Sequence, residues 1–130
     1  MTPWPRSLAG YVPELRAADD EWRLRVILHE FGLLWETTTP ADRPGLIADE
    51  PPALDPRWDA FLAAYAEHLS WHLGVAAPDW VFQPGRYLPS MWFAGAPPTM
   101  RAARVEAVVH SPAAFEAHGV LLPARELAVV

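Results

Sequence analysis

The stretch DPRWDAFLAAYAEHLSWHLG, residues 55–74, carries the clearest helix signal in the chain. Asp55 is a residue type that caps helix N-termini, and Pro56 suits the first helical position because its missing N–H would have no partner there. Gly74 follows the last apolar residue, and glycine readily adopts the left-handed conformation that ends many helices. The sequence therefore predicts one helix over residues 56–73.

A second helix is predicted upstream, over residues 19–36. Two aspartates and a glutamate at residues 19–21 suit its positive N-terminal end. One apolar face follows helical spacing and consists of Leu24, Ile27, Leu28, Phe31, Leu34 and Trp35. A second apolar stripe lies on nearly the opposite side and consists of Trp22, Val26 and Leu33. A helix that is apolar on two sides is either central to a core or covered by a partner.

Proline divides the rest of the chain into short elements. Fifteen of the 130 residues are proline, against a usual share of about 5%, while seven tryptophans argue against disorder. We expect ordered loops over residues 37–56, with a helical turn near 43–48, and over residues 75–98. Thr99 is expected to cap a third helix that ends before Pro112.

The C-terminal part is expected to add a short helix and a strand. The helix, PAAFEAH, is closed by Gly119, and VLL at 120–122 has the composition of a short strand. The expected fold is all-α, an irregular bundle of four to five helices with long proline-rich ordered loops and at most a minor strand pair. We expect residues 1–18 to form an N-terminal arm and residues 19–130 to form a single helical domain.

Composition excludes several kinds of chemistry. The chain contains no cysteine, which excludes disulfides, thiolate catalysis and thiolate-bound metals. It contains no lysine, which excludes Schiff bases and a Walker-type phosphate lysine. The formal net charge of −6 argues against a nucleic-acid partner, and no residue pattern indicates a cofactor.

The expected location is the cytoplasm. Neither end carries a basic patch followed by an apolar run, as a signal peptide would. The longest apolar region, residues 22–35, is interrupted by two arginines, a histidine and a glutamate, so no membrane partner is expected.

Two histidines in the 56–73 helix have the spacing of a zinc motif. His68 and His72 stand four residues apart and share a helix face, but Glu67 precedes both instead of lying between them. The sequence does not select a third ligand among the other histidines, which are His29, His110 and His118. We therefore expect His72 to be stabilised by the helix dipole and His68 to pack against Phe61. The alternative is a small metal-dependent hydrolase that uses this histidine pair.

The segment over residues 86–100 is a proline- and glycine-rich loop with large apolar side chains. Either it folds back over the core, or it anchors another protein, since Trp, Met and Arg are enriched at binding hot spots. The candidate partner-binding residues are Trp71, Arg86, Tyr87, Met91, Trp92, Phe93 and Met100.

Four motifs recur at Trp58 to Leu69, Pro78 to Trp80, Leu88 to Phe93, and Ser111 to Val120. Through these motifs the chain, over about residues 19–130, resembles a group of uncharacterised actinobacterial domains. Such domains often follow a helix-turn-helix module or sit beside genes for nucleotidyltransferase-like proteins, in pairs that look like toxin–antitoxin loci. The helix-turn-helix is missing from this chain, so the resemblance does not imply operator binding.

The leading functional expectation is a non-enzymatic interaction or regulatory module, antitoxin-like, whose partner is the product of an adjacent gene. A homodimeric structural protein is a further alternative. Light scattering would detect a homodimer, and stoichiometric zinc would indicate the hydrolase.

Overall fold

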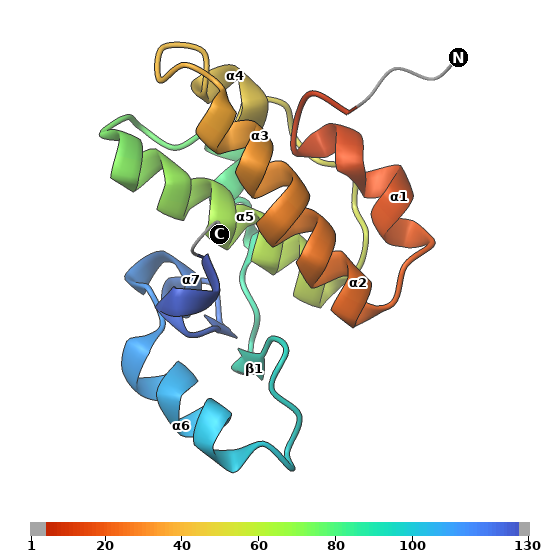
Figure 1. Cartoon of the computed structure of the whole chain (residues 1–130), viewed down its shortest axis with the longest axis vertical. Helices are drawn as coiled ribbons and strands as arrows, with labels where there is room; N and C mark the ends of the chain where they lie inside the picture. The colour runs from red at the N-terminus through yellow and green to blue at the C-terminus, as the bar shows by residue number, and fades with distance from the viewer. Residues whose placement is uncertain (1–4, 128–130) are drawn as a thin grey trace. The chain divides into compact units, whose positions relative to one another are not determined.

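The computed structural model describes residues 5–127 and divides them into two compact units, with the boundary between Leu54 and Asp55. Both units are built mainly from helices (Figure 1). The expectation of a mostly helical chain is confirmed. Among the described residues, no helix is long and apolar enough to cross a membrane.

The first unit begins with a 3-10 turn, Ala9–Tyr11, and helix α1, Val12–Arg16. These residues are packed into the unit, because Leu8, Val12 and Leu15 are fully buried. The Tyr11 ring meets that of Phe31 edge-on, with the ring centres 6.0 Å apart. The apolar side chains of Leu8, Tyr11, Val12 and Leu15 thus contribute to the core of the first unit.

The predicted helix over residues 19–36 is present but has an unexpected middle. Helix α2, Asp20–Arg25, is followed by a π-helical segment, Val26–Phe31, and by α3, Gly32–Thr37. The Asp19 carboxylate caps α2 by accepting a hydrogen bond of 2.8 Å from the Trp22 N–H. A π-helical turn holds more residues than an α-turn, so it changes which later residues face the core.

The second apolar stripe is divided between core and surface. Val26 is buried, whereas Trp22 and Leu33 are exposed. Ile27, Leu28, Phe31 and Trp35 of the main stripe are buried as expected. The first unit ends with α4, Pro44–Ile47, which falls within the helical turn expected near residues 43–48.

The second unit is centred on α5, Pro56–Leu73, whose two ends match the sequence prediction. The Asp55 carboxylate accepts a hydrogen bond of 3.0 Å from the Trp58 N–H, and Gly74 adopts a left-handed φ of 77°. All side chains from Ala60 to Glu67 are buried. Two 3-10 turns follow, Asp79–Phe82 and Pro84–Arg86.

A small parallel strand pair joins two distant segments of this unit. Strand β1, Trp92–Phe93, pairs with β2, Val120–Leu121, with Trp92 opposite Val120. The connection between them contains α6, Arg101–His110, and α7, Ala113–Ala117. A last 3-10 turn spans Ala124–Leu127.

Helices α6 and α7 differ in how they attach to the unit. Phe115 of α7 packs against Phe61 and Tyr65 of α5, with ring centres 5.4 and 6.3 Å apart. In Figure 1, α6 lies farther from α5 than α7 does. The expected Thr99 cap is wrong, because the residue at the N-cap of α6 is Met100 and its side chain makes no capping bond. Helix α6 is thus a peripheral element of the second unit.

Candidate functional site

The most exposed apolar surface of the second unit is one face of α6. Val105, Val108 and Val109 are 57%, 57% and 65% exposed, and they stand at helical spacings of three and four residues. Single exposed apolar residues are ordinary on protein surfaces, but a contiguous apolar patch marks an interaction site. The three valines therefore identify α6 as the candidate site.

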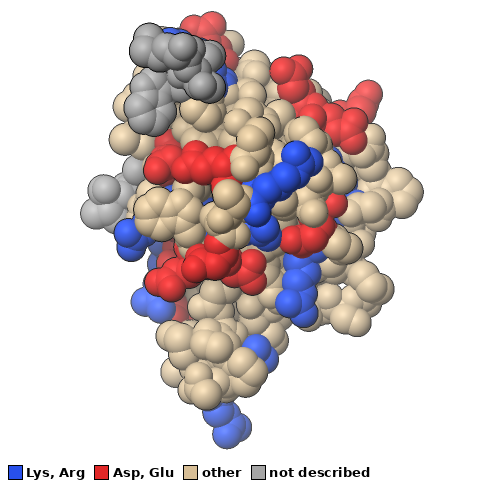
Figure 2. All heavy atoms as spheres, turned by 90° about the vertical axis from the view of Figure 1, so that its right-hand side faces the viewer, with Lys and Arg blue, Asp and Glu red and all other residues tan. Residues whose placement is uncertain are grey.

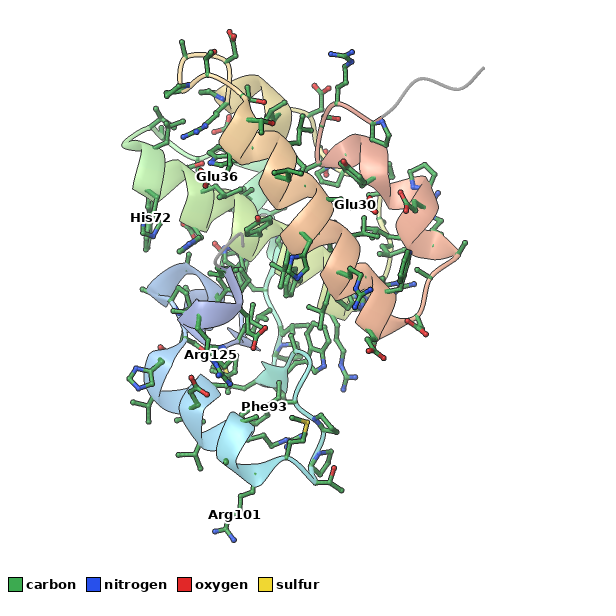
Figure 3. The ribbon with its side chains drawn as sticks, viewed as in Figure 1. Glu30, Glu36, His72, Phe93, Arg101 and Arg125 are labelled. Atoms are coloured by element: carbon green, nitrogen blue, oxygen red, sulfur yellow. The ribbon has the colours of Figure 1, made fainter. Side chains whose placement is uncertain are left out.

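These valines form one side of a groove of about 310 Å³, which we call the α6 groove. The groove is lined by Phe93, Arg101, Arg104, Val105, Val108 and Val109. Figure 3 shows Phe93 on the side of β1 that faces α6, and Arg101 projecting from the first turn of α6. The α6 groove is thus a shallow depression between a strand and a helix, and its exposed lining is apolar.

Arg104 shapes the groove through two contacts. Its guanidinium lies over the Phe93 ring, 4.4 Å from the ring centre, and its Nε–H donates a hydrogen bond of 2.9 Å to the Ala96 carbonyl oxygen. These contacts join α6 to β1 and to the loop that follows it. Phe93 is thereby held beneath a cation, and one edge of the groove is positively charged.

The opposite face of α6 explains why the valines point outward. Ala107 is fully buried, and Ser111 after the helix end bonds the Ala107 carbonyl oxygen and accepts a hydrogen bond of 2.8 Å from the Leu122 N–H. Glu106 pairs with Arg125 at 2.9 Å. A small residue allows this close packing, so the alanine side of the helix docks and the larger valines remain in solvent.

The charged side chains that line the α6 groove are all positive. Its lining includes two arginines and no carboxylate. In Figure 2, the lower end of the second unit, where α6 begins, shows uncharged and blue atoms without red ones. A chain with a formal net charge of −6 therefore presents a locally basic groove.

Four of the residues predicted to bind a partner are exposed. Trp71 is 55% exposed in the last turn of α5, and Met91 and Met100 are exposed on either side of β1 and its following loop. Tyr87 is also partly open to solvent, although its ring stacks flat on that of His118 with the centres 4.3 Å apart. Among these four, Met100 directly precedes Arg101, a residue that lines the α6 groove, in the sequence.

The other three are used inside the fold to different extents. Arg86 is buried, with its guanidinium 4.9 Å from the Trp80 ring centre and its Nη1 donating to the Asp59 carbonyl oxygen at 3.3 Å. Trp92 is half-buried and meets the Trp58 ring at 5.2 Å. Phe93 is half-buried and lines the α6 groove. The 86–100 segment thus both folds back on the core and supplies part of an exposed surface.

His68 and His72 do share a face of α5, with their ring centres 4.3 Å apart. Burial, and then the neighbouring His72, lower the pKa of His68 to about 4, so its imidazole is neutral at physiological pH. Its aromatic neighbour is Phe115, at 5.8 Å, where the sequence had suggested Phe61. No cluster of three metal-ligating side chains is found within residues 5–127. The pair therefore acquires no third ligand from the described fold.

A buried acid–base pair was missed by sequence reasoning. Glu67 is buried, and its Oε1 lies 3.0 Å from Nε2 of the fully buried His118. The His118 Nδ1 lies 2.7 Å from the Arg86 carbonyl oxygen, which can only accept, so Nδ1 carries a proton. Since protein atoms contact both ring nitrogens, this imidazole joins α5, the Pro84–Arg86 turn and the end of α7.

The first unit carries a hollow of different character. It measures about 590 Å³, and three carboxylates, those of Glu14, Asp19 and Glu21, are among its lining residues. The exposed Trp22 of the expected partner-binding stripe is also there, with the Arg25 guanidinium 5.7 Å from its ring centre. An arginine of the chain itself thus already lies over this ring.

The α6 face was missed because its sequence signal is ambiguous. The spacing of Val105, Val108 and Val109 shows an apolar stripe, and apolar stripes ordinarily face the core. The alternative signal is the pair Ala103 and Ala107 on the other side, which offers a flatter docking face. Sequence alone does not decide between a valine face and an alanine face.

Comparisons of the chain with models of protein families, with curated proteins and with solved structures found no match. The resemblance to actinobacterial domains therefore stays a prediction.

Proposed function

We propose that this protein is a non-enzymatic interaction module, the antitoxin-like half of a bacterial two-gene locus, and that it binds the product of the adjacent gene in the cytoplasm. The observation that carries the proposal is the exposed valine face of α6 beside Phe93. The α6 groove is the primary contact, and the exposed Trp71 and Met91 provide further contact area.

The energetics favour an occupied groove. Each valine is more than half exposed, so covering it contributes about 1 kcal/mol. Phe93 and Met100 add apolar area that is also incompletely buried. Apolar groups at the centre of a patch with charged groups at its border are typical of protein interfaces.

The test is co-expression of the tagged full chain with the product of its neighbouring gene, followed by size-exclusion chromatography with light scattering. We expect a stable complex, and we expect Val105→Ser with Val108→Ser to weaken it at least tenfold. Both valines are exposed, so the folded state tolerates these changes within about 0.5 kcal/mol. Val75→Ser is the matched control, because Val75 is an exposed valine of the same unit outside the groove.

A growth assay provides the second readout. The neighbouring gene expressed alone should inhibit growth, and this chain should relieve the inhibition unless the two serine substitutions are present. If the chain elutes alone and rescue is unchanged by the double substitution, the proposal is wrong.

A further inference from the structure

The α6 groove has a shape and a charge that restrict what can fill it. Its floor is apolar, its two charged lining residues are Arg101 and Arg104, and no carboxylate lines it. The one acid of α6, Glu106, is paired with Arg125. A ligand must therefore supply apolar side chains for the floor and negative charge for the arginine side.

Resting on the proposed function, we propose that the groove's occupant is an amphipathic helix of the partner protein, whose apolar stripe is bordered by aspartate or glutamate. Helices bind in apolar grooves through side chains at positions i, i+3 or i+4, and i+7. The ten residues of α6 give a length of about 15 Å, which matches about three turns of a partner helix. Valines spaced by three and four residues present the ridges that such a helix packs against.

Charge complementarity selects an acidic helix. Arg101 is exposed at the start of α6, where a positive side chain gains nothing from the positive end of its own helix. Arg104 is held over Phe93 with its charge at the groove edge. A carboxylate beside the partner's apolar stripe would reach these guanidinium groups and orient the bound helix.

A second copy of this chain fits the groove poorly. In a symmetric dimer the same patch meets itself, so Arg101 and Arg104 of both copies would gather in one interface without a lining carboxylate. A membrane surface fits poorly as well. Membrane-surface helices carry bulky Trp, Phe or Leu side chains on their apolar face, whereas α6 contributes valines to this shallow groove.

The experiment uses the full-length protein and two synthetic peptides of about 14 residues with identical leucine stripes at helical spacing. One peptide carries glutamate beside the stripe and the other carries lysine. Binding is measured by calorimetry, and the groove is located by backbone amide shifts of residues 101–110. We expect the glutamate peptide to bind about three- to tenfold more tightly at low salt, although the protein's net charge of −6 favours the lysine peptide.

Three variants locate the effect. Arg101→Glu should remove or reverse the preference for the glutamate peptide, while Arg6→Glu, the same charge change at an exposed residue outside the groove lining, should preserve it. Val105→Ser with Val108→Ser should abolish binding of both peptides. In about 1 M salt, where the screening length falls to about 3 Å, the two peptides should bind alike.

The outcomes separate the partner's chemistry from the proposed function. Equal or tighter binding of the lysine peptide overturns the acidic helix, and so does absence of binding by both peptides. In either case a valine-dependent complex with the neighbouring protein would leave the proposed function standing. Valine-dependent dimerisation in light scattering, or valine-dependent binding to phosphatidylglycerol vesicles, would assign the groove to a second copy or to a membrane and would also overturn the inference.

Discussion

At the residue scale, the pKa of His68 gives a pH dependence that can be measured. Burial, followed by the charge of His72, lowers this pKa to about 4, whereas an unfolded histidine has a pKa of about 6.5. Between these values the unfolded chain binds a proton that the folded chain does not bind. The contribution of His68 to the free energy of unfolding is therefore complete above about pH 6.5 and is lost as the pH falls toward 4.

We expect His68 to contribute a loss on the order of 1–2 kcal/mol over this window, discounted because the ring is only partly buried. His68→Gln should remove this part of the pH dependence, as measured by urea unfolding at several pH values. An NMR titration of the His68 ring gives the direct check. A midpoint near the unfolded value would contradict the prediction.

The Glu67–His118 pair makes a second residue-scale prediction. Glu67→Leu leaves the buried His118 Nε2 without its partner, and an unsatisfied buried polar group costs about 1–3 kcal/mol. Glu67→Gln keeps an oxygen or an N–H at the same place and should cost less. Thermal unfolding of both variants checks the order. When His118 is replaced by phenylalanine, the destabilisation caused by Glu67→Leu and by Glu67→Gln should become more similar. If the two substitutions destabilise the native protein equally, the hydrogen bond has no role in stability.

At the element scale, alanine substitutions at two glycines with positive φ allow the cost of backbone strain to be measured separately from the cost of a steric clash. Gly74 ends α5 with a φ of 77°, and a Cβ there would meet nothing within 4 Å. Gly119 has a φ of 87°, and a Cβ would lie 2.9 Å from the Leu88 Cβ. Gly74→Ala should cost about 1–2 kcal/mol for its conformation alone.

Gly119→Ala should cost more, by about 1–3 kcal/mol, because Leu88 must also shift. Its backbone carbonyl accepts from the Trp92 N–H at 2.9 Å, so the strand pair should loosen as well. Denaturant midpoints of the two variants, with amide exchange at Trp92, make the comparison. Equal destabilisation would show that contact with Leu88 is unimportant.

At the scale of the whole molecule, charge predicts weak interaction with nucleic acids. The chain has ten arginines, no lysine and a net charge of −6. Nucleic-acid binding requires several cationic groups on one surface, and the α6 groove contains only two. We expect no binding to a labelled duplex of about 20 base pairs at about 0.05 M salt, as measured by fluorescence anisotropy. Micromolar binding that Arg101→Glu abolishes would contradict this expectation.

The ends of α5 and the helical class of the chain were predictable from the sequence because their causes are local. Asp55 and Pro56 start α5 and Gly74 ends it, and each acts on residues within about one helical turn. A short strand at residues 120–122 was also predicted, but its parallel partner at Trp92–Phe93 was not, since that pairing joins segments separated by α6 and α7. The π-helical segment at Val26–Phe31 was likewise not predicted, although the main apolar stripe of that helix faces the core as expected.

The sequence by itself determined the predominance of helix, both ends of α5 and the exclusion of cysteine and lysine chemistry. Only the tertiary structure decided which faces remain open. Glu67 and His118 meet across 51 residues of chain, and α6 docks through Ala107 so that its valines face solvent. Burial depends on which distant segments pack against a residue, and helical periodicity records that a face is apolar without recording what covers it.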